Sequence, residues 1–209
     1  MLKSQLVVLG GGGNALDALD TLQTSYEVVA FVDDDVTKQQ RTIGGIPVTS
    51  RSALMKYPDA KVVSLIGSEK TFIRREEIIR SFNIHQSRFG RVIHPNANVS
   101  AYASIGRDVI IFAGVTIPSN ARIGSHVFIL PNTVIHHDSV IEDYTIIGAS
   151  VVVAGNVNIG RSSFVGSGSS IKNNVEIGAC SLIGMSANVT RSFKEESVLV
   201  GNPAKQLAR

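Results

Sequence analysis

The sequence predicts an α/β unit over residues 1–90, followed by a parallel β-helix over residues 91–209. Two observations predict the first part: apolar runs alternate with segments of helical spacing, and four glycines follow the first run. One observation predicts the second part: Val or Ile recurs every six residues from Val99 to Val189. These patterns divide the chain into two domains, and the second ends in a C-terminal tail.

Three apolar runs in the first part predict the strands of a small parallel sheet. They are QLVVL at 5–9, EVVAFV at 27–32 and KVVSLIG at 61–67. Continuous apolar strands that alternate with helices are typical of parallel sheets covered on both faces. Two helices are expected, and their inward faces are Ala15, Leu16, Leu19 and Leu22 in the first, and Phe72, Ile73, Ile78, Ile79 and Phe82 in the second.

The glycine loop at residues 10–13 lies between the first strand and its helix. Glycine lets backbone N–H groups approach a phosphate at the helix N-terminus, where the dipole favours an anion; a simple tight turn is the alternative. Asp33 follows Gly13 by 20 residues, where dinucleotide folds place a ribose-binding acid. A Rossmann-like domain is therefore expected. Because this domain has room for about one mononucleotide-binding half, a mononucleotide or nucleotide sugar fits better than NAD.

The repeat in the second part predicts a β-helix. Sixteen successive positions at six-residue steps are Val or Ile, without one insertion, and the next residue is Gly in seven of them. A fixed six-residue period with inward β-branched side chains and glycine at the corners is typical of a parallel β-helix.

Composition excludes several classes of protein. The net charge is +3 and the pI about 9.1, yet no block of five like charges occurs, so no nucleic-acid partner is expected. The single Cys180 excludes an internal disulfide and a cysteine-cluster metal site. No window approaches a membrane span, and the N-terminal apolar run is too short for a signal peptide. We expect a cytoplasmic protein that does not insert into membranes.

The stretch IHHDSV at 135–140 is the best candidate for a chemical site, because His136 and His137 are the only adjacent pair among five histidines. Three hexads make one coil of a triangular β-helix, so residues 18 apart stack. Gly155 then lies over His137 and Ser119 lies beneath it. A glycine in that place leaves space for an outward-pointing imidazole, whereas His126 is expected to be an ordinary surface residue at a corner.

The whole chain resembles the bacterial nucleotide-amino-sugar N-acetyltransferases and their sialic-acid O-acetyltransferase relatives, which are hexapeptide-repeat acyltransferases. The segments that carry the resemblance are VVLGGGGNA, FVDDD, VIHHDSVI, AGNVNIG and VLVGNPAK. It implies a left-handed β-helix, a homotrimer and acetyl-CoA bound between neighbouring prisms. The implied reaction is acetyl transfer from acetyl-CoA to a nucleotide-linked amino sugar, at the 4-amino group of a dideoxy sugar, for bacterial surface glycans.

The resemblance also implies residue roles. His137 takes a proton from the sugar amine, a role that suits an imidazole, and Asp138 orients it and favours a more basic ring. A backbone N–H near Gly155 steadies the oxyanion. The other residues implied are Ser167, Met185 and Lys205 for acetyl-CoA, with Arg191 and Lys194 also available for its phosphates, and Gly12, Gly13, Asn14, Asp33, Asp34 and Gly67 for the nucleotide sugar.

Two positions depart from the family pattern. Asn14 and Ile146 stand where the family usually has histidines, and His136 has no family role. Three alternatives stay open: a sugar O-acetyltransferase, a non-catalytic nucleotide-sugar-binding scaffold, and a zinc enzyme of the carbonic anhydrase type. The zinc enzyme needs three converging histidines; since the spacing of His126, His136 and His137 does not stack neatly, no metal is expected.

Overall fold

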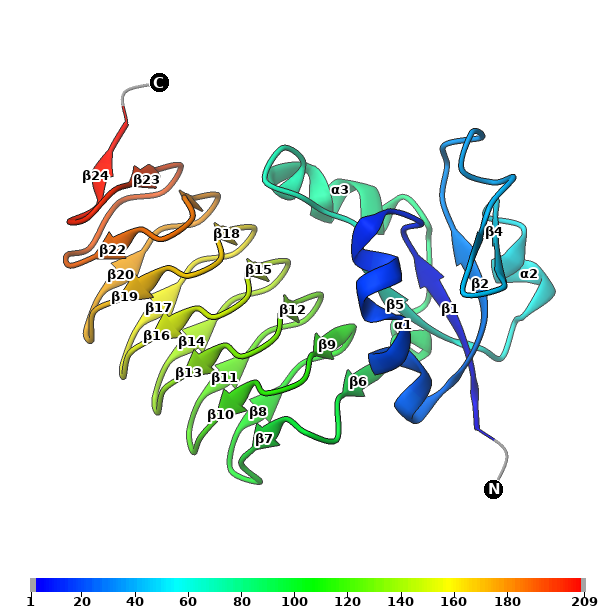
Figure 1. Cartoon of the computed structure of the whole chain (residues 1–209), viewed down its shortest axis with the longest axis horizontal. Coiled ribbons are helices and arrows are strands. Elements are labelled where there is room, and N and C mark those ends of the chain that lie inside the picture. The colour runs from blue at the N-terminus through cyan, green and yellow to red at the C-terminus, as the bar shows by residue number, and fades with distance from the viewer. Residues whose placement is uncertain (1–2, 208–209) are drawn as a thin grey trace.

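The computed structural model describes residues 3–207. Figure 1 shows two parts side by side: a sheet with helices, coloured blue to cyan, and a ladder of stacked coils, coloured green to red. Within residues 3–207, no helix has both the length and the apolar character that crossing a bilayer requires.

The first part is built on a five-stranded sheet of order β3-β4-β2-β1-β5. Its pairs are parallel except for β3 with β4. Successive residues of β1 point into different clusters, because Leu6 and Val8 pack on one side and Val7 and Leu9 on the other. This explains the continuous apolar run. The strands are β1 (Gln5–Leu9), β2 (Glu27–Val32), β3 (Thr42–Ile43), β4 (Ile46–Thr49) and β5 (Lys61–Ser64).

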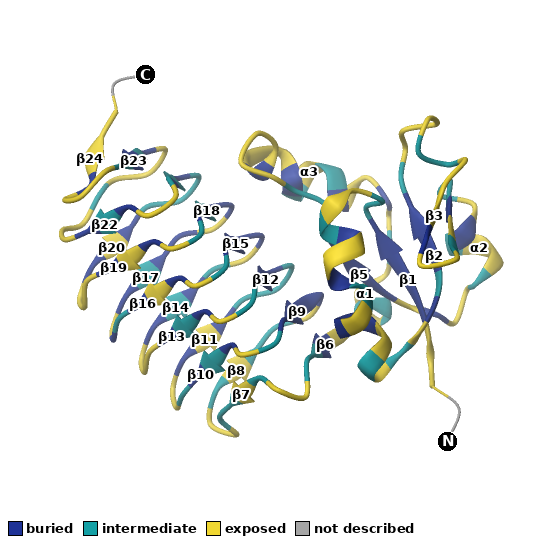
Figure 2. Ribbon diagram, in the orientation of Figure 1, coloured by how far each residue is buried: buried dark blue, intermediate teal, exposed yellow. Residues whose placement is uncertain are grey.

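The helices of this part differ from the expectation in two places. The first helix buries Ala15, Ala18 and Leu22, but Leu16 is 62% exposed; Figure 2 shows its mixed buried and exposed surface. The expected second helix is split, and Ile73 is 48% exposed because Arg75 takes the inward position instead. The helical segments are α1 (Gly13–Ser25), α2 (Ala53–Lys56), η1 (Phe72–Arg74), α3 (Arg75–Arg80) and η2 (Gln86–Arg88).

The second part is a parallel β-helix with three sheets, as the six-residue period predicts. Sheet I holds β7 (Asn98–Val99), β10 (Thr116–Ile117), β13 (Val134–Ile135), β16 (Val152–Val153), β19 (Ser170–Ile171) and β22 (Asn188–Val189). Sheet II holds β8 (Ser104–Ile105), β11 (Arg122–Ile123), β14 (Val140–Ile141), β17 (Asn158–Ile159) and β20 (Glu176–Ile177). Sheet III holds β6 (Arg91–Ile93), β9 (Val109–Ile111), β12 (Phe128–Ile129), β15 (Ile146–Ile147), β18 (Phe164–Val165), β21 (Leu182–Ile183), β23 (Val198–Val200) and β24 (Lys205–Gln206).

Stacking in the β-helix follows an 18-residue register, as the pairs Ile123 with Ile141 and Ile129 with Ile147 show. The repeated Val and Ile residues form one column of buried side chains down its axis. Corner residues adopt positive φ, among them Asn120, Asp138, Asn156 and Asn174, which also lie 18 apart. Asn and Asp tolerate this left-handed backbone better than other non-glycine residues do, so their short side chains stack in a line along one corner.

The two parts share one apolar cluster at sheet III. Leu6, Val8 and Leu22 of the first part belong to the same buried cluster as Phe128 and Ile146 of the second. In Figure 1 the coils that carry β9, β12 and β15 face α1 and β5. Sheet III is therefore the side of the β-helix on which the first part docks.

Candidate functional site

His137 and Asp138 form a hydrogen-bonded pair at the corner between sheets I and II. The Nδ1 atom of His137 lies 2.7 Å from Oδ2 of Asp138, and the side chains are 66% and 50% exposed. A neutral imidazole that donates its Nδ1–H to this carboxylate keeps Nε2 as the nitrogen that can accept a proton. His136 is exposed beside it.

Gly155 lies one coil beyond His137, against its ring. A Cβ atom at Gly155 would lie 2.9 Å from both Cε1 and Nε2 of His137. That separation is shorter than real Cβ contacts, so any larger residue there would displace the imidazole. The glycine therefore leaves the room that His137 occupies.

The Asp138 carboxylate is held in its ionised form. Hydrogen bonding first to His137 and then to the side chain of Asn120 holds the pKa of Asp138 below its ordinary value. Asn120 belongs to the corner line of Asn and Asp residues, one coil before Asp138. The carboxylate is thus fixed from two sides, and one of its oxygens faces His137.

A cavity of about 640 Å³ opens above the glycine loop, where α1 begins at Gly13. It is lined by all six residues that were expected to bind the nucleotide sugar: Gly12, Gly13, Asn14, Asp33, Asp34 and Gly67. A Cβ at Gly12 or Gly13 would meet no protein atom within 4 Å. These two positions face open space, which suits the close approach of a ligand to the backbone.

Asp33 and Asp34 already have partners within the protein. Oδ2 of Asp33 accepts from the Gly11 N–H at 3.0 Å and from Nζ of Lys38 at 3.0 Å. Arg51 binds Asp34 through two hydrogen bonds of 2.9 and 2.6 Å and lowers its pKa. Asp33 thus fixes the glycine loop to the end of β2, and any contact of either carboxylate with a ribose stays a prediction.

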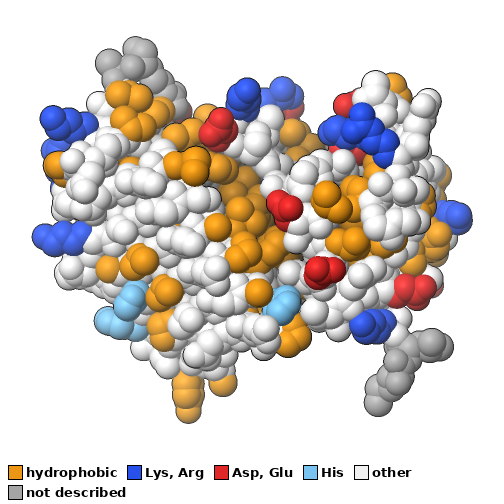
Figure 3. All heavy atoms as spheres, in the orientation of Figure 1, with side chains coloured by type: hydrophobic (Ala, Val, Ile, Leu, Met, Phe, Trp, Pro, Cys, Tyr) orange, Lys and Arg blue, Asp and Glu red, His pale blue; other side chains and the backbone are white. Residues whose placement is uncertain are grey.

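A second cavity of about 350 Å³ adjoins the first, and Asn14, Gly67 and Ser68 line both. Nδ2 of Asn14 donates to the Gly67 carbonyl oxygen at 3.1 Å across the boundary. The far wall of the second cavity is apolar and comes from sheet III and its edge, through Phe128, Leu130, Ile146 and Phe164. Figure 3 shows hydrophobic side chains gathered in the hollow between the two parts. Of these wall residues the sequence singled out only Ile146, as a departure from the family pattern, because the docking of the two parts creates the wall.

The residues expected to bind acetyl-CoA lie at different corners. Gly155 follows β16 at the corner of sheets I and II, next to His137, whereas Ser167 and Met185 lie between sheets III and I. Ser167 also lines the second cavity, and Met185 is 72% exposed. Lys205 is exposed in β24. Within one chain, sheet I separates His137 from Ser167 and from both cavities.

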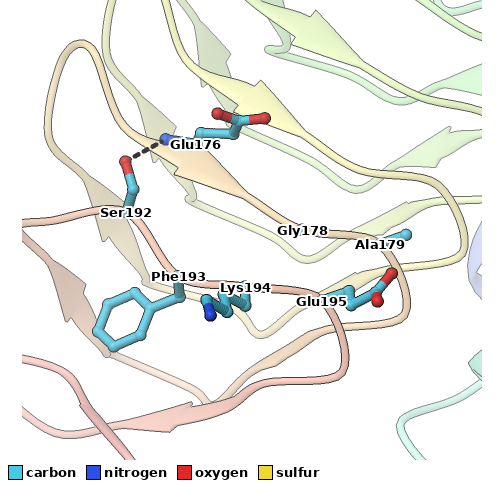
Figure 4. Close-up of a pocket in the computed structure, with 7 residues that line it drawn as sticks. All are labelled: Glu176, Gly178, Ala179, Ser192, Phe193, Lys194 and Glu195. Carbon is cyan, nitrogen blue, oxygen red and sulfur yellow. Dashed lines mark hydrogen bonds between the residues drawn. The ribbon is translucent and has the colours of Figure 1, made fainter.

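A groove of about 500 Å³ lies on the last coils, and Figure 4 draws the residues that line it. Glu176, Lys194 and Glu195 line it, and the Glu176 N–H donates to Oγ of Ser192 at 2.9 Å. Two carboxylates beside one ammonium group give this groove no positive charge for phosphates. The charge of this groove therefore does not favour Lys194 as a residue that binds the phosphates of acetyl-CoA.

His126 is not the surface corner residue that the sequence suggested. Its side chain is 14% exposed, and Nδ1 lies 2.8 Å from Oδ2 of the buried Asp108. It stacks on Tyr144, with ring centroids 4.5 Å apart. The docking of the first part covers this corner, which the repeat alone does not reveal. Among residues 3–207, no three His, Cys, Asp or Glu side chains are grouped to hold a metal ion.

Comparisons with known proteins find one family model and several solved structures. Residues 90–199 match the model described as GMPPB C-terminal domain. No curated protein matches the chain. A perosamine N-acetyltransferase from Caulobacter crescentus, solved in complex with CoA and GDP-perosamine, is 27% identical with a TM-score of 0.88, covering 99% of this chain and 98% of that one.

Two further structures share the fold at lower identity. The acetyltransferase domain of PglB from Neisseria gonorrhoeae, in complex with acetyl coenzyme A, is 24% identical with a TM-score of 0.83. WeeI from Acinetobacter baumannii is 22% identical with a TM-score of 0.81. Each match covers 98% of this chain and 100% of the other. These two structures share the fold, and the perosamine N-acetyltransferase confirms the resemblance expected from the sequence.

Proposed function

We propose that this chain, which belongs to the GMPPB C-terminal domain family through residues 90–199, is an acetyl-CoA-dependent acetyltransferase acting on a nucleotide-linked amino sugar. One observation carries the proposal: a perosamine N-acetyltransferase with bound CoA and GDP-perosamine matches the chain over 99% of its length. A metal has no part in the reaction, which needs a base and an activated acetyl group. The sugar is expected to be a 4-amino dideoxy sugar.

The His137 and Asp138 pair supports a general-base mechanism. Nε2 of His137 accepts the proton as the sugar amine attacks the thioester carbonyl carbon, and Asp138 holds the Nδ1–H. A backbone N–H near Gly155 stabilises the negative oxygen of the tetrahedral intermediate. Collapse of that intermediate forms the amide, and the CoA thiolate leaves with the proton that the imidazole had taken.

The two adjoining cavities support the placement of the nucleotide sugar. The diphosphate lies against the backbone of Gly12 and Gly13 at the start of α1. The sugar reaches past Asn14 and Gly67 into the second cavity, which shares those residues with the first. The apolar wall there, with Leu130 and Phe164, suits a sugar that lacks some hydroxyl groups. The first part thereby acts as a Rossmann-like nucleotide-binding domain over residues 1–90.

A homotrimer completes the site in this proposal. His137 lies at one edge of sheet I, and Ser167 lies at the other edge, beside the sugar cavity. Within one copy of the left-handed β-helix these two edges stay apart. They come together only when the sheet I–II corner of one copy faces the sugar cavity of a neighbouring copy. Acetyl-CoA then lies between Gly155 of one copy and Ser167 and Met185 of the next. Light scattering should give a trimer, and a fully active monomer would contradict this arrangement.

Mixed oligomers test the shared site directly. His137→Ala removes the base, and Gly13→Val blocks the nucleotide cavity, so each pure variant should be nearly inactive. If the two residues act in one site from different copies, dissociating and reassociating the mixture should restore part of the activity. Mixed but inactive trimers would show that each copy works alone.

An acetyl-transfer assay tests the function itself. The protein is given acetyl-CoA and a panel of GDP- and UDP-linked 4-amino sugars, with the matching hydroxy sugars as controls, and thiol release is measured. Release that depends on the amine supports the proposal, and release with a hydroxy sugar would instead identify an O-acetyltransferase. Nucleotide binding without thiol release for any sugar would indicate a non-catalytic scaffold. The cytoplasmic location is part of the same proposal, since both proposed substrates are expected there.

A further inference from the structure

A buried arginine joins the two parts of the molecule. Arg75, the first residue of α3, is fully buried, and all its hydrogen bonds reach backbone carbonyl groups. Its Nε donates to Ile66 at 2.6 Å, its Nη2 to Ser64 at 3.3 Å and its Nη1 to His126. The guanidinium therefore connects the end of β5 to a corner of the β-helix.

Asp108 and His126 reach the same strand end from the β-helix. One oxygen of Asp108 accepts from the Ser64 N–H at 2.6 Å, and the other lies 2.8 Å from Nδ1 of His126. Asp108, His126 and Tyr144 lie 18 residues apart at the corner of sheets II and III, all with positive φ. Tyr144 stacks on the His126 ring with an interplanar angle of 5°. The three residues stack along one corner of the β-helix, and the end of β5 packs against this corner through Ser64 and Asp108.

This arrangement is a costly way to join two surfaces. Burial lowers the pKa of Arg75 to about 10, although the Asp108 charge opposes the shift, and burial also raises the pKa of Asp108. Apolar residues of the same volume often stabilise a contact as well as a buried ion pair does. Apolar residues cannot, however, fix the direction of several carbonyl groups. The cluster is thus better suited to positioning the backbone than to docking alone.

The backbone that Arg75 fixes continues into both cavities. Ile66, Gly67 and Ser68 line the larger cavity, and the last two also line the smaller one. A Cβ atom at Gly67 would lie 3.0 Å from Cδ of Arg75 and 2.6 Å from Cδ1 of Ile146. Gly67, whose φ is +132°, therefore rests directly on the Arg75 side chain, and its carbonyl oxygen accepts from Asn14.

We propose that Arg75, which acts at the same strand end as Asp108 and His126, is a positioning residue for the Ile66–Ser68 wall and thereby sets the affinity of the nucleotide-sugar cavity. The inference rests on the proposed function, because it takes the ligand of that cavity to be a nucleotide sugar. The β-helix thus shapes the nucleotide site through this cluster, although none of the three residues lines either cavity.

Arg75→Lys tests the proposal, and Arg88→Lys is the matched control. Lysine keeps the charge but cannot make the three-way contact. Arg88 also binds three backbone carbonyls of the first part, those of Leu54, Tyr57 and Ala60, but it does not line the cavity. Arg75→Lys should raise both the Kd of GDP or UDP, measured by calorimetry, and the KM of the sugar nucleotide about tenfold. The KM of acetyl-CoA should stay within about twofold, and Arg88→Lys should change none of these.

A direct measurement of nucleotide binding distinguishes a failure of the proposed function from a failure of the positioning role of Arg75. If the wild-type protein binds neither GDP nor UDP, the proposed function itself is wrong. If it binds one of them and Arg75→Lys binds it as tightly as Arg88→Lys does, the positioning role is wrong. An equal rise in the Kd of both variants would also overturn it, because that result reports general loosening of the domain.

Two variants of His126 decide the matter if Arg75→Lys does not fold. His126→Asn tolerates the positive φ, and its amide N–H can replace the Nδ1 donor to Asp108. His126→Leu removes that donor. The Asn variant should keep nucleotide binding within about twofold of the wild type, and the Leu variant should weaken it about tenfold. Equal nucleotide binding by the two variants would overturn the proposal.

Discussion

Gly155→Ala perturbs the candidate base without touching its chemistry. Gly155 does not have a positive φ, so alanine brings no backbone strain there. The new methyl group would lie 2.9 Å from Cε1 and Nε2 of His137, and ordinary contact begins at 3.4 Å. The imidazole must retreat by about 0.5 Å, and since a misplacement of about 1 Å can cost about 10²-fold, we expect kcat to fall about tenfold or more.

Steady-state kinetics with both substrates measures this effect. The KM of the sugar nucleotide should stay within about twofold, because Gly155 is not among the residues that line its cavity. Asn173→Ala, one coil further along the same corner, is the control and should behave like the wild type. Adding Gly155→Ala to His137→Ala should cause no further loss, since the two changes act through one imidazole.

Two results would contradict the expected behaviour of Gly155→Ala. Wild-type kcat in Gly155→Ala would show that the imidazole position does not limit the reaction. A full further loss in the His137→Ala background would show that Gly155 acts on something other than the His137 ring, such as the oxyanion or the cofactor.

The remaining predictions concern other parts of the site. His137→Ala should lower kcat about 10²–10⁴-fold with nucleotide Kd unchanged, whereas His136→Ala should behave like the wild type; the reverse result would move the base to His136. Gly13→Val should raise the KM of the sugar nucleotide far more than that of acetyl-CoA, since no protein atom lies within 4 Å of the added Cβ; equal effects would make the loop a simple turn. By carbon NMR titration, Asp138 should titrate below 3.8, and Asn120→Ala should raise its pKa toward that value. An unchanged titration would remove Asn120 from the site.

Much of the fold follows from local patterns. The Val and Ile period predicts the stacked coils, because every inward position meets the same environment one coil away. From the sequence alone the same register places Gly155 over His137, and the separation of 2.9 Å between a Cβ at Gly155 and the His137 ring agrees with it. The glycine loop and the end of β2 line one cavity for a similar reason, since adjacent parallel strands end at the same edge.

The features that the sequence did not reveal depend on how the two parts of the chain dock. Ile146 precedes the repeat residue Ile147, and the sequence marks it only as a departure from the family pattern, yet docking makes it part of a cavity wall. His126 looks like an exposed corner residue until the first part covers it. The 18-residue spacing of Asp108, His126 and Tyr144 predicts that these residues stack at one corner. It does not predict that Arg75 of α3 donates a hydrogen bond to the backbone of His126. Helical spacing also could not show that Arg75 would displace Ile73 from the buried face.

Acetyl transfer to a sugar amine leaves an amide on the sugar nitrogen, and NMR analysis of the product detects that amide. The protein is incubated with acetyl-CoA and a GDP- or UDP-linked 4-amino sugar, with His137→Ala as the control. We expect one new amide at the sugar nitrogen for each CoA thiol released, and almost none with the control. Thioester hydrolysis without an acetylated sugar, or an acetyl group on a sugar oxygen, would contradict it.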